Sequence, residues 1–99
     1  MNFIFHPSAK KELEQAVAYY EKCQIGLGYE FLVEIYSTIQ RILNFPNAWS
    51  TLSIHTRRCL TNRFPFGIIY QIQNQNDDCI RIISIMQLNK KPGYWHKRL

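Results

Sequence analysis

Two stretches of the sequence repeat their apolar residues with the period of an α-helix. In the first stretch, the spacings are four, three, one and three residues, and the members are Ala9, Leu13, Ala16, Val17 and Tyr20. The second stretch has the same period, and its members are Leu27, Phe31, Leu32, Ile35, Ile39, Ile42 and Leu43. Each set lies on one face of an amphipathic helix. We therefore predict two helices that each cover a sheet with one face.

Turn-forming and capping residues indicate where these helices begin and end. Pro7 fits the first turn of a helix, so His6 or Ser8 should lie at the cap, and Ser8 is the better capping type. The first helix should end shortly before Gly26, and Pro46 should end the second. A short glycine-containing connection between two helices predicts an antiparallel hairpin.

Four stretches rich in β-branched and aromatic residues are predicted as strands: residues 2–6, 55–61, 67–73 and 79–86. In the last strand, strict alternation would place Ile80, Ile82 and Ser84 on one face and Arg81, Ile83 and Ile85 on the other. Both of these faces are fairly apolar, so we expect this strand to lie inside the sheet.

The connections between these elements are short and polar. Residues 74–78 are predicted as a turn, and residues 47–53 as a connector whose Trp49 closes the edge of the core. Short connections favour antiparallel neighbours. The predicted fold class is α+β with the order β-α-α-β-β-β: a helical hairpin packed on a mainly antiparallel sheet, in a single domain of residues 1–99.

Charge divides the chain into two parts. The net charge is +5 over 99 residues. Residues 1–40 carry three lysines against five glutamates, a net −2, and residues 41–99 carry nine basic residues against two aspartates, a net +7. This positive field suits a phosphate backbone or an acidic protein partner. The sequence shows neither a membrane-spanning stretch nor a signal peptide, so we expect a cytoplasmic protein.

The sequence contains no glycine-rich phosphate loop, zinc-ligand spacing or nucleophile elbow, so we expect no metal site and no cofactor. RNA can be cut without a metal if a base, an acid and cations converge on the phosphate. Tyr94 or His96 could move protons, and Arg63 or Arg81 could supply charge; these four are the candidate catalytic residues. The alternative is that Tyr94 and Trp95 anchor the C-terminal segment (residues 88–99) to the sheet, while the cations bind an acidic partner.

Several short motifs occur in order along the whole chain: His6-Pro7, Tyr19-Tyr20, Gly26-Leu27-Gly28, Pro46 with Trp49, Arg57-Arg58, Arg63-Phe64-Pro65-Phe66-Gly67-Ile68-Ile69-Tyr70 and Lys91-Pro92-Gly93-Tyr94-Trp95. Together they resemble the RelE/ParE toxin superfamily. The resemblance implies the topology predicted above and a toxin that a small cognate antitoxin wraps and neutralises. The residues expected to contact the antitoxin or a cellular target are Arg57, Arg58, Arg63, Arg81, Lys90, Lys91, Tyr94, Trp95 and Arg98.

The superfamily has two well-known activities, and the resemblance favours one of them. RelE-like members cut messenger RNA at the ribosome, whereas ParE-like members poison DNA gyrase. The ribonuclease branch has an arginine three residues before the tyrosine of the middle strand, where this chain has Gly67 before Tyr70. A second arginine, expected near residues 86–88, is also missing, although Tyr94 matches a tyrosine of that branch. We therefore predict a ParE-like toxin that acts on gyrase.

Two alternatives stay open. The chain could be a ribosome-dependent, metal-independent endoribonuclease that relies on basic residues together with Tyr94 and His96. It could also be an inactive binding module that retains the toxin fold. Growth after induced expression without antitoxin distinguishes the inactive module from the other two.

Overall fold

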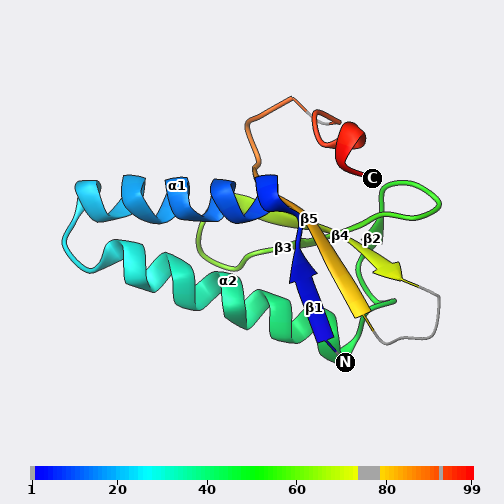
Figure 1. Ribbon diagram of the computed structural model, residues 1–99. Helices are drawn as coiled ribbons and strands as arrows, with labels where there is room; N and C mark the ends of the chain where they lie inside the picture. Colours follow the sequence, from blue (N-terminus) through cyan, green and yellow to red (C-terminus); the bar gives the residue numbers. More distant parts are fainter. Residues whose placement is uncertain (1, 74–78, 92) are drawn as a thin grey trace.

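A computed structural model describes residues 2–73, 79–91 and 93–99 of the chain (Figure 1). The elements in chain order are β1 (Asn2–Phe5), α1 (Pro7–Cys23), α2 (Leu27–Asn44), β2 (Ser50–Thr51), β3 (Arg57–Leu60), β4 (Phe66–Gln73), β5 (Cys79–Gln87) and a 3-10 turn, η1 (His96–Arg98). The turn predicted at residues 74–78 and the residue Pro92 lie outside the described residues. No helix in the described part of the chain is long and apolar enough to cross a membrane.

The strands form one five-stranded sheet in the order β1-β5-β4-β3-β2. β1 is parallel to β5, and every other neighbouring pair is antiparallel. This arrangement confirms the predicted α+β class, with a helical hairpin on a mainly antiparallel sheet. β5 lies between β1 and β4, as its two apolar faces predicted. The sequence reasoning missed β2, a two-residue strand inside the stretch predicted as a connector.

The helical hairpin has the predicted extent, and its first helix is capped by one of the two candidate residues. The residue before α1 is His6, and its Nδ1 accepts a hydrogen bond from the backbone N–H of Ser8 at 3.0 Å. Of the two cap candidates, the structure therefore has His6 rather than Ser8, because Pro7 already occupies the first helical position and the imidazole nitrogen satisfies a free N–H. Gly26 adopts a φ of 89° before α2, a conformation that glycine tolerates best.

The main core lies between the two helices and one face of the sheet. At its centre, Phe31 of α2 packs against Phe64 and Phe66 with ring centroids 5.1 and 4.8 Å apart, and Tyr20 of α1 completes this aromatic group. Trp49 is partly buried against the same core, as predicted. These aromatic contacts hold the helices to the sheet largely by burying apolar area.

A smaller apolar cluster lies apart from the main core and consists of Ile69, Ile83, Met86 and Trp95. A β-bulge in β5 creates part of it: Ile69 pairs with Ser84, whereas the next residue of β4 pairs with Ile82, so Ile83 is an extra residue. The predicted strict alternation is therefore wrong beyond Ile82. Ile85 joins Ile80 and Ile82 in the main core, and Ile83 belongs to the smaller cluster.

Candidate functional site

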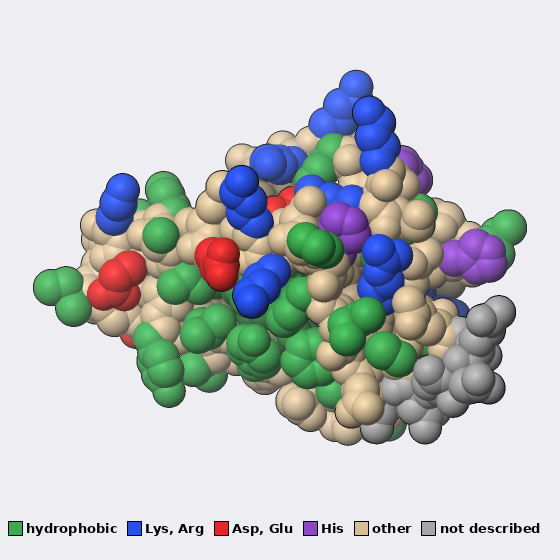
Figure 2. Space-filling model, in the orientation of Figure 1, with side chains coloured by type: hydrophobic (Ala, Val, Ile, Leu, Met, Phe, Trp, Pro, Cys, Tyr) green, Lys and Arg blue, Asp and Glu red, His purple; other side chains and the backbone are tan. Residues whose placement is uncertain are grey.

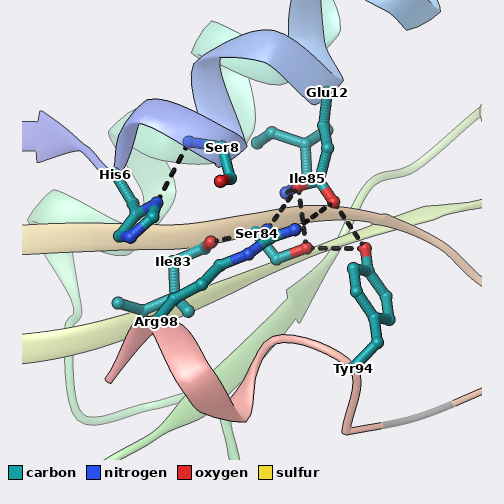
Figure 3. A network of polar contacts seen from close by, with 8 residues as sticks. All are labelled: His6, Ser8, Glu12, Ile83, Ser84, Ile85, Tyr94 and Arg98. Atoms are coloured by element: carbon teal, nitrogen blue, oxygen red, sulfur yellow. Dashed lines mark hydrogen bonds and ion pairs between the residues drawn. The ribbon is translucent and has the colours of Figure 1, made fainter.

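The C-terminal segment is fastened to the body of the protein by one carboxylate, that of Glu12 on α1 (Figure 3). Two nitrogens of Arg98 donate to its oxygens at 2.9 and 3.1 Å, and the hydroxyl of Tyr94 donates at 2.8 Å. From β5, the hydroxyl of Ser84 and the backbone N–H of Ile85 each donate at 3.0 Å. Glu12 therefore joins α1 to β5 and the C-terminal segment, which follow it in the sequence by 72 and 86 positions at Ser84 and Arg98.

This network is largely withdrawn from water. The side chains of Glu12 and Arg98 are each 16% exposed, and the Arg98 guanidinium also donates to the carbonyl oxygen of Ile83 at 3.0 Å. A two-point arginine–carboxylate contact is strong and directional. It fixes η1 against β5 and the first half of α1.

Tyr94 is held as a neutral hydrogen-bond donor. Burial raises the pKa of Tyr94 to about 12; the neighbouring hydroxyl of Ser84 opposes this shift, and the hydrogen bond to Glu12 adds to it. Above and beside the ring, the charged ends of Lys90 and Arg98 lie 5.0 and 5.2 Å from the ring centroid. The phenol is therefore protonated near neutral pH, and its hydroxyl is already engaged.

Trp95 serves as the apolar anchor of the same segment. Its indole is 3% exposed in the cluster with Ile69, Ile83 and Met86, and His96 lies against it with ring centroids 4.5 Å apart. The structure thus shows the tail-anchoring arrangement for Tyr94 and Trp95 that the sequence left as an alternative. A partner can contact Trp95 directly only if the segment moves.

Two of the four candidate arginines outside the C-terminal segment hold parts of the fold together. One nitrogen of Arg57 donates to the carbonyl oxygens of Asn47 and Trp49, at 3.0 and 2.8 Å, and so secures the connector after α2. Arg63 forms an exposed ion pair with Glu30 of α2, and its guanidinium lies 5.0 Å from the ring centroid of Phe64. Both lie where the sheet meets α2 and its connector.

Arg58 occupies the space that Gly67 leaves open. A Cβ atom at Gly67 would lie 3.1 Å from Cδ of Arg58, so a larger residue there would displace the arginine stem. Arg58 belongs to β3, and Gly67 belongs to the neighbouring strand β4. In the ribonuclease branch of the superfamily that the chain resembles, the middle strand has an arginine at this position. Here the stem of Arg58, from the neighbouring strand, covers the position instead.

Arg81 lies near the start of β5, opposite Gln71 of β4 and Ile4 of β1. The charge of Arg81 acts on His6. Burial lowers the pKa of His6, and the nearby Arg81 and Arg98 lower it further. Lys90 and Lys91 are exposed at the start of the C-terminal segment. Figure 2 shows basic side chains gathered over this part of the molecule, at the upper edge of the view.

The structure brings some candidate residues together and separates others. The charged ends of Lys90 and Arg98 both lie over the ring of Tyr94, and both Arg81 and Arg98 are near enough to His6 to lower its pKa. Arg63 is held by α2 instead. The four candidate catalytic residues therefore contact different elements and do not converge through any contact among the described residues.

Sequence reasoning missed Glu12 and Ser84 as members of the site. The helical period could have indicated Glu12, since this residue lies three positions after Ala9 and four before Ala16, at the border of the apolar face.

A pocket of about 320 Å³ lies beside Glu12, between α1 and the C-terminal segment. Its lining residues are Glu12, Gln15, Ala16, Tyr19, Tyr20, Phe66, Ile85, Gln87, Lys90 and Tyr94.

Comparisons with known proteins agree with this architecture. The family model described as the ParE toxin of the type II toxin–antitoxin system parDE matches residues 3–89. Among solved structures, a chain of the structure titled "Chromosomal ParDE TA system from P. aeruginosa" superposes with a TM-score of 0.73. It is 16% identical, and the match covers 90% of this chain and 97% of that one, which shows a shared fold. No curated protein matches the chain in sequence.

Proposed function

The chain belongs to the ParE toxin family and is the toxin component of a type II toxin–antitoxin pair, and from this premise we propose that it inhibits DNA gyrase by binding. The family also implies an antitoxin partner. In this proposal the toxin acts in the cytoplasm and carries out no RNA cleavage of its own.

The observation that carries the proposal is the state of Tyr94. General acid–base catalysis needs groups whose pKa lies near the working pH and that reach the reacting atoms. The pKa of Tyr94 is raised to about 12, and its hydroxyl donates to Glu12 and lies 2.8 Å from the hydroxyl oxygen of Ser84. Arg63, another of the four candidate catalytic residues, forms an ion pair with Glu30. This arrangement favours a binding surface over a ribonuclease centre.

The surface that would meet gyrase is the basic one around the C-terminal segment. Lys90, Lys91 and Lys97 are exposed there, and the network at Glu12 holds the segment in one position. Preorganised positive charge raises association rates with an acidic partner and limits the entropy lost on binding. The same surface could receive an acidic part of the antitoxin, which would then block the target directly.

A supercoiling assay with purified gyrase tests the proposal. We expect the wild-type protein to inhibit supercoiling, and a Lys90→Ala, Lys91→Ala double variant to need about tenfold more protein, equivalent to about 1.4 kcal/mol. Lys22→Ala is the matched control, since Lys22 is an exposed lysine in the last turn of α1. Unchanged supercoiling at large toxin excess would refute the gyrase assignment.

Two further experiments distinguish the two alternative functions. New RNA ends in a translating extract, with supercoiling unaffected, would assign the protein to the ribosome-dependent ribonucleases. Normal growth after induction without antitoxin would indicate an inactive binding module.

A further inference from the structure

The two solvent-facing sides of α2 differ sharply in charge. On the side towards the β3–β4 connection, Glu30 pairs with Arg63, and Arg41 donates to the carbonyl oxygen of Leu60 at 3.2 Å. The backbone N–H of Arg63 also donates to Glu34. All three charged residues of α2 are therefore engaged on this one side.

The other side of α2 carries no charge. Its residues follow helical spacing and form what we call the neutral stripe: Tyr29, Leu32, Val33, Tyr36 and Gln40. Three of its apolar side chains are well exposed: Tyr29 at 71%, Val33 at 49% and Tyr36 at 41%. The helix thus has a second apolar face, distinct from the buried one that includes Phe31, Ile35, Ile39 and Ile42.

The neutral stripe continues into an apolar surface on neighbouring elements. Phe3 and Phe5 of β1 pack edge-on against Tyr36, with centroids 6.2 and 6.4 Å away. Leu32 and Tyr36 also line an open groove of about 810 Å³ between α1, α2 and β1, whose wall on α1 carries the charged residues Lys10, Glu14 and Glu21. Figure 2 shows the resulting concentration of hydrophobic side chains below α1.

Exposed apolar patches of this kind mark interaction surfaces, and tyrosine is common among the residues that dominate binding. The absence of charge narrows the choice of partner. An acidic partner is attracted to the basic part of the chain, residues 41–99, and gains nothing electrostatically from the neutral stripe. A partner that fits this stripe has an uncharged apolar helix face of its own.

We propose that the partner is a second copy of this chain, with the two α2 helices packed antiparallel across a twofold axis. Such an interface is formed by the same surface on both copies. An axis between Leu32 and Val33 places Tyr29 of one copy opposite Tyr36 of the other, because these positions are equidistant from the centre. The α2 residues that meet at this axis carry no charge. The proposal is independent of the gyrase assignment.

Sedimentation equilibrium of the purified protein, from about 1 μM to about 200 μM, tests the dimer. We expect wild-type protein to show twice the chain mass at the upper end, and Val33→Glu to weaken association at least tenfold, since the twofold axis would bring two carboxylates together. Ile54→Glu is the control, because Ile54 is 93% exposed in the β2–β3 connection. Monomeric wild-type protein at about 200 μM would overturn the proposal.

Disulfide trapping tests the position of the axis. In a Cys23→Ser background, which removes the exposed thiol of α1, Val33→Cys lies beside the axis and should form a covalent dimer on mild oxidation. Gln40→Cys lies on the same stripe, but about 10 Å further along the helix, and should stay unlinked. Equal linking of both variants would contradict the axis. A monomeric wild type whose Val33→Glu variant loses its antitoxin would assign the stripe to the antitoxin and overturn the dimer.

Discussion

Replacing Glu12 by glutamine should destabilise the protein more than any other single exchange of a carboxylate for an amide on α1. The carboxylate accepts hydrogen bonds from Arg98, Tyr94, Ser84 and the backbone of Ile85. Glutamine keeps one oxygen but turns an NH₂ group towards the remaining donors. The charge that balances Arg98 is also lost.

The expected cost follows from how far the pair is buried. Removing one partner of a fully buried ion pair costs about 3–5 kcal/mol, because the remaining charge is uncompensated. Here both side chains are 16% exposed, and Arg98 keeps its bond to the carbonyl oxygen of Ile83. We therefore expect a loss of about 2–4 kcal/mol, a large part of the roughly 5–15 kcal/mol that stabilises a typical domain.

Urea unfolding at pH 7, followed by far-ultraviolet circular dichroism, measures this loss as a lower transition midpoint with an unchanged slope. Glu14→Gln is the matched control, because Glu14 is exposed on the same helix and a surface exchange changes stability by about 0.5 kcal/mol or less. If Glu12→Gln were as stable as Glu14→Gln, the network would not hold the C-terminal segment, and the reasoning would fail.

Three further outcomes follow from individual contacts. His6→Ala should lower the free energy of unfolding by about 0.5–2 kcal/mol and His6→Asn by much less, because asparagine can also cap α1. The pKa of His6 is lowered in the fold, so the stability present above its ordinary pKa of 6.5 should fall as the pH drops. In urea titrations, His6→Asn should flatten this pH dependence. Burial raises the pKa of Tyr70 and Tyr94 to about 12, so stability present below pH 10 should be lost as the pH rises towards 12. In an absorbance titration these two tyrosines should ionise last, and the Tyr70→Phe and Tyr94→Phe variants should each remove one of the late steps. Gly28→Ala should cost about 1–3 kcal/mol in thermal unfolding, because its Cβ would lie 2.6 Å from the carbonyl oxygen of Val17; wild-type stability would contradict the close approach of the helices.

The sequence by itself determined the elements whose signals are local. The 3.6-residue period placed both helices, and Gly26 and Pro46 marked ends that the structure confirms at Cys23 and Asn44. The strand pattern located β3, β4 and β5, and the two apolar faces of β5 predicted its interior place in the sheet. Periodicity, capping and turn chemistry act over a few residues, so they can be read from neighbouring positions.

The tertiary structure alone decided which distant groups meet. Glu12 and Arg98 are 86 positions apart, and only the docking of α1 and η1 on β5 brings them together. The bulge at Ile83 shifts the second half of β5 by one residue, so the predicted facing fails there. Arg58 fills the space above Gly67 from a neighbouring strand. Such contacts depend on strand register and layer packing, which are set by the burial of the whole core rather than by any short run of residues.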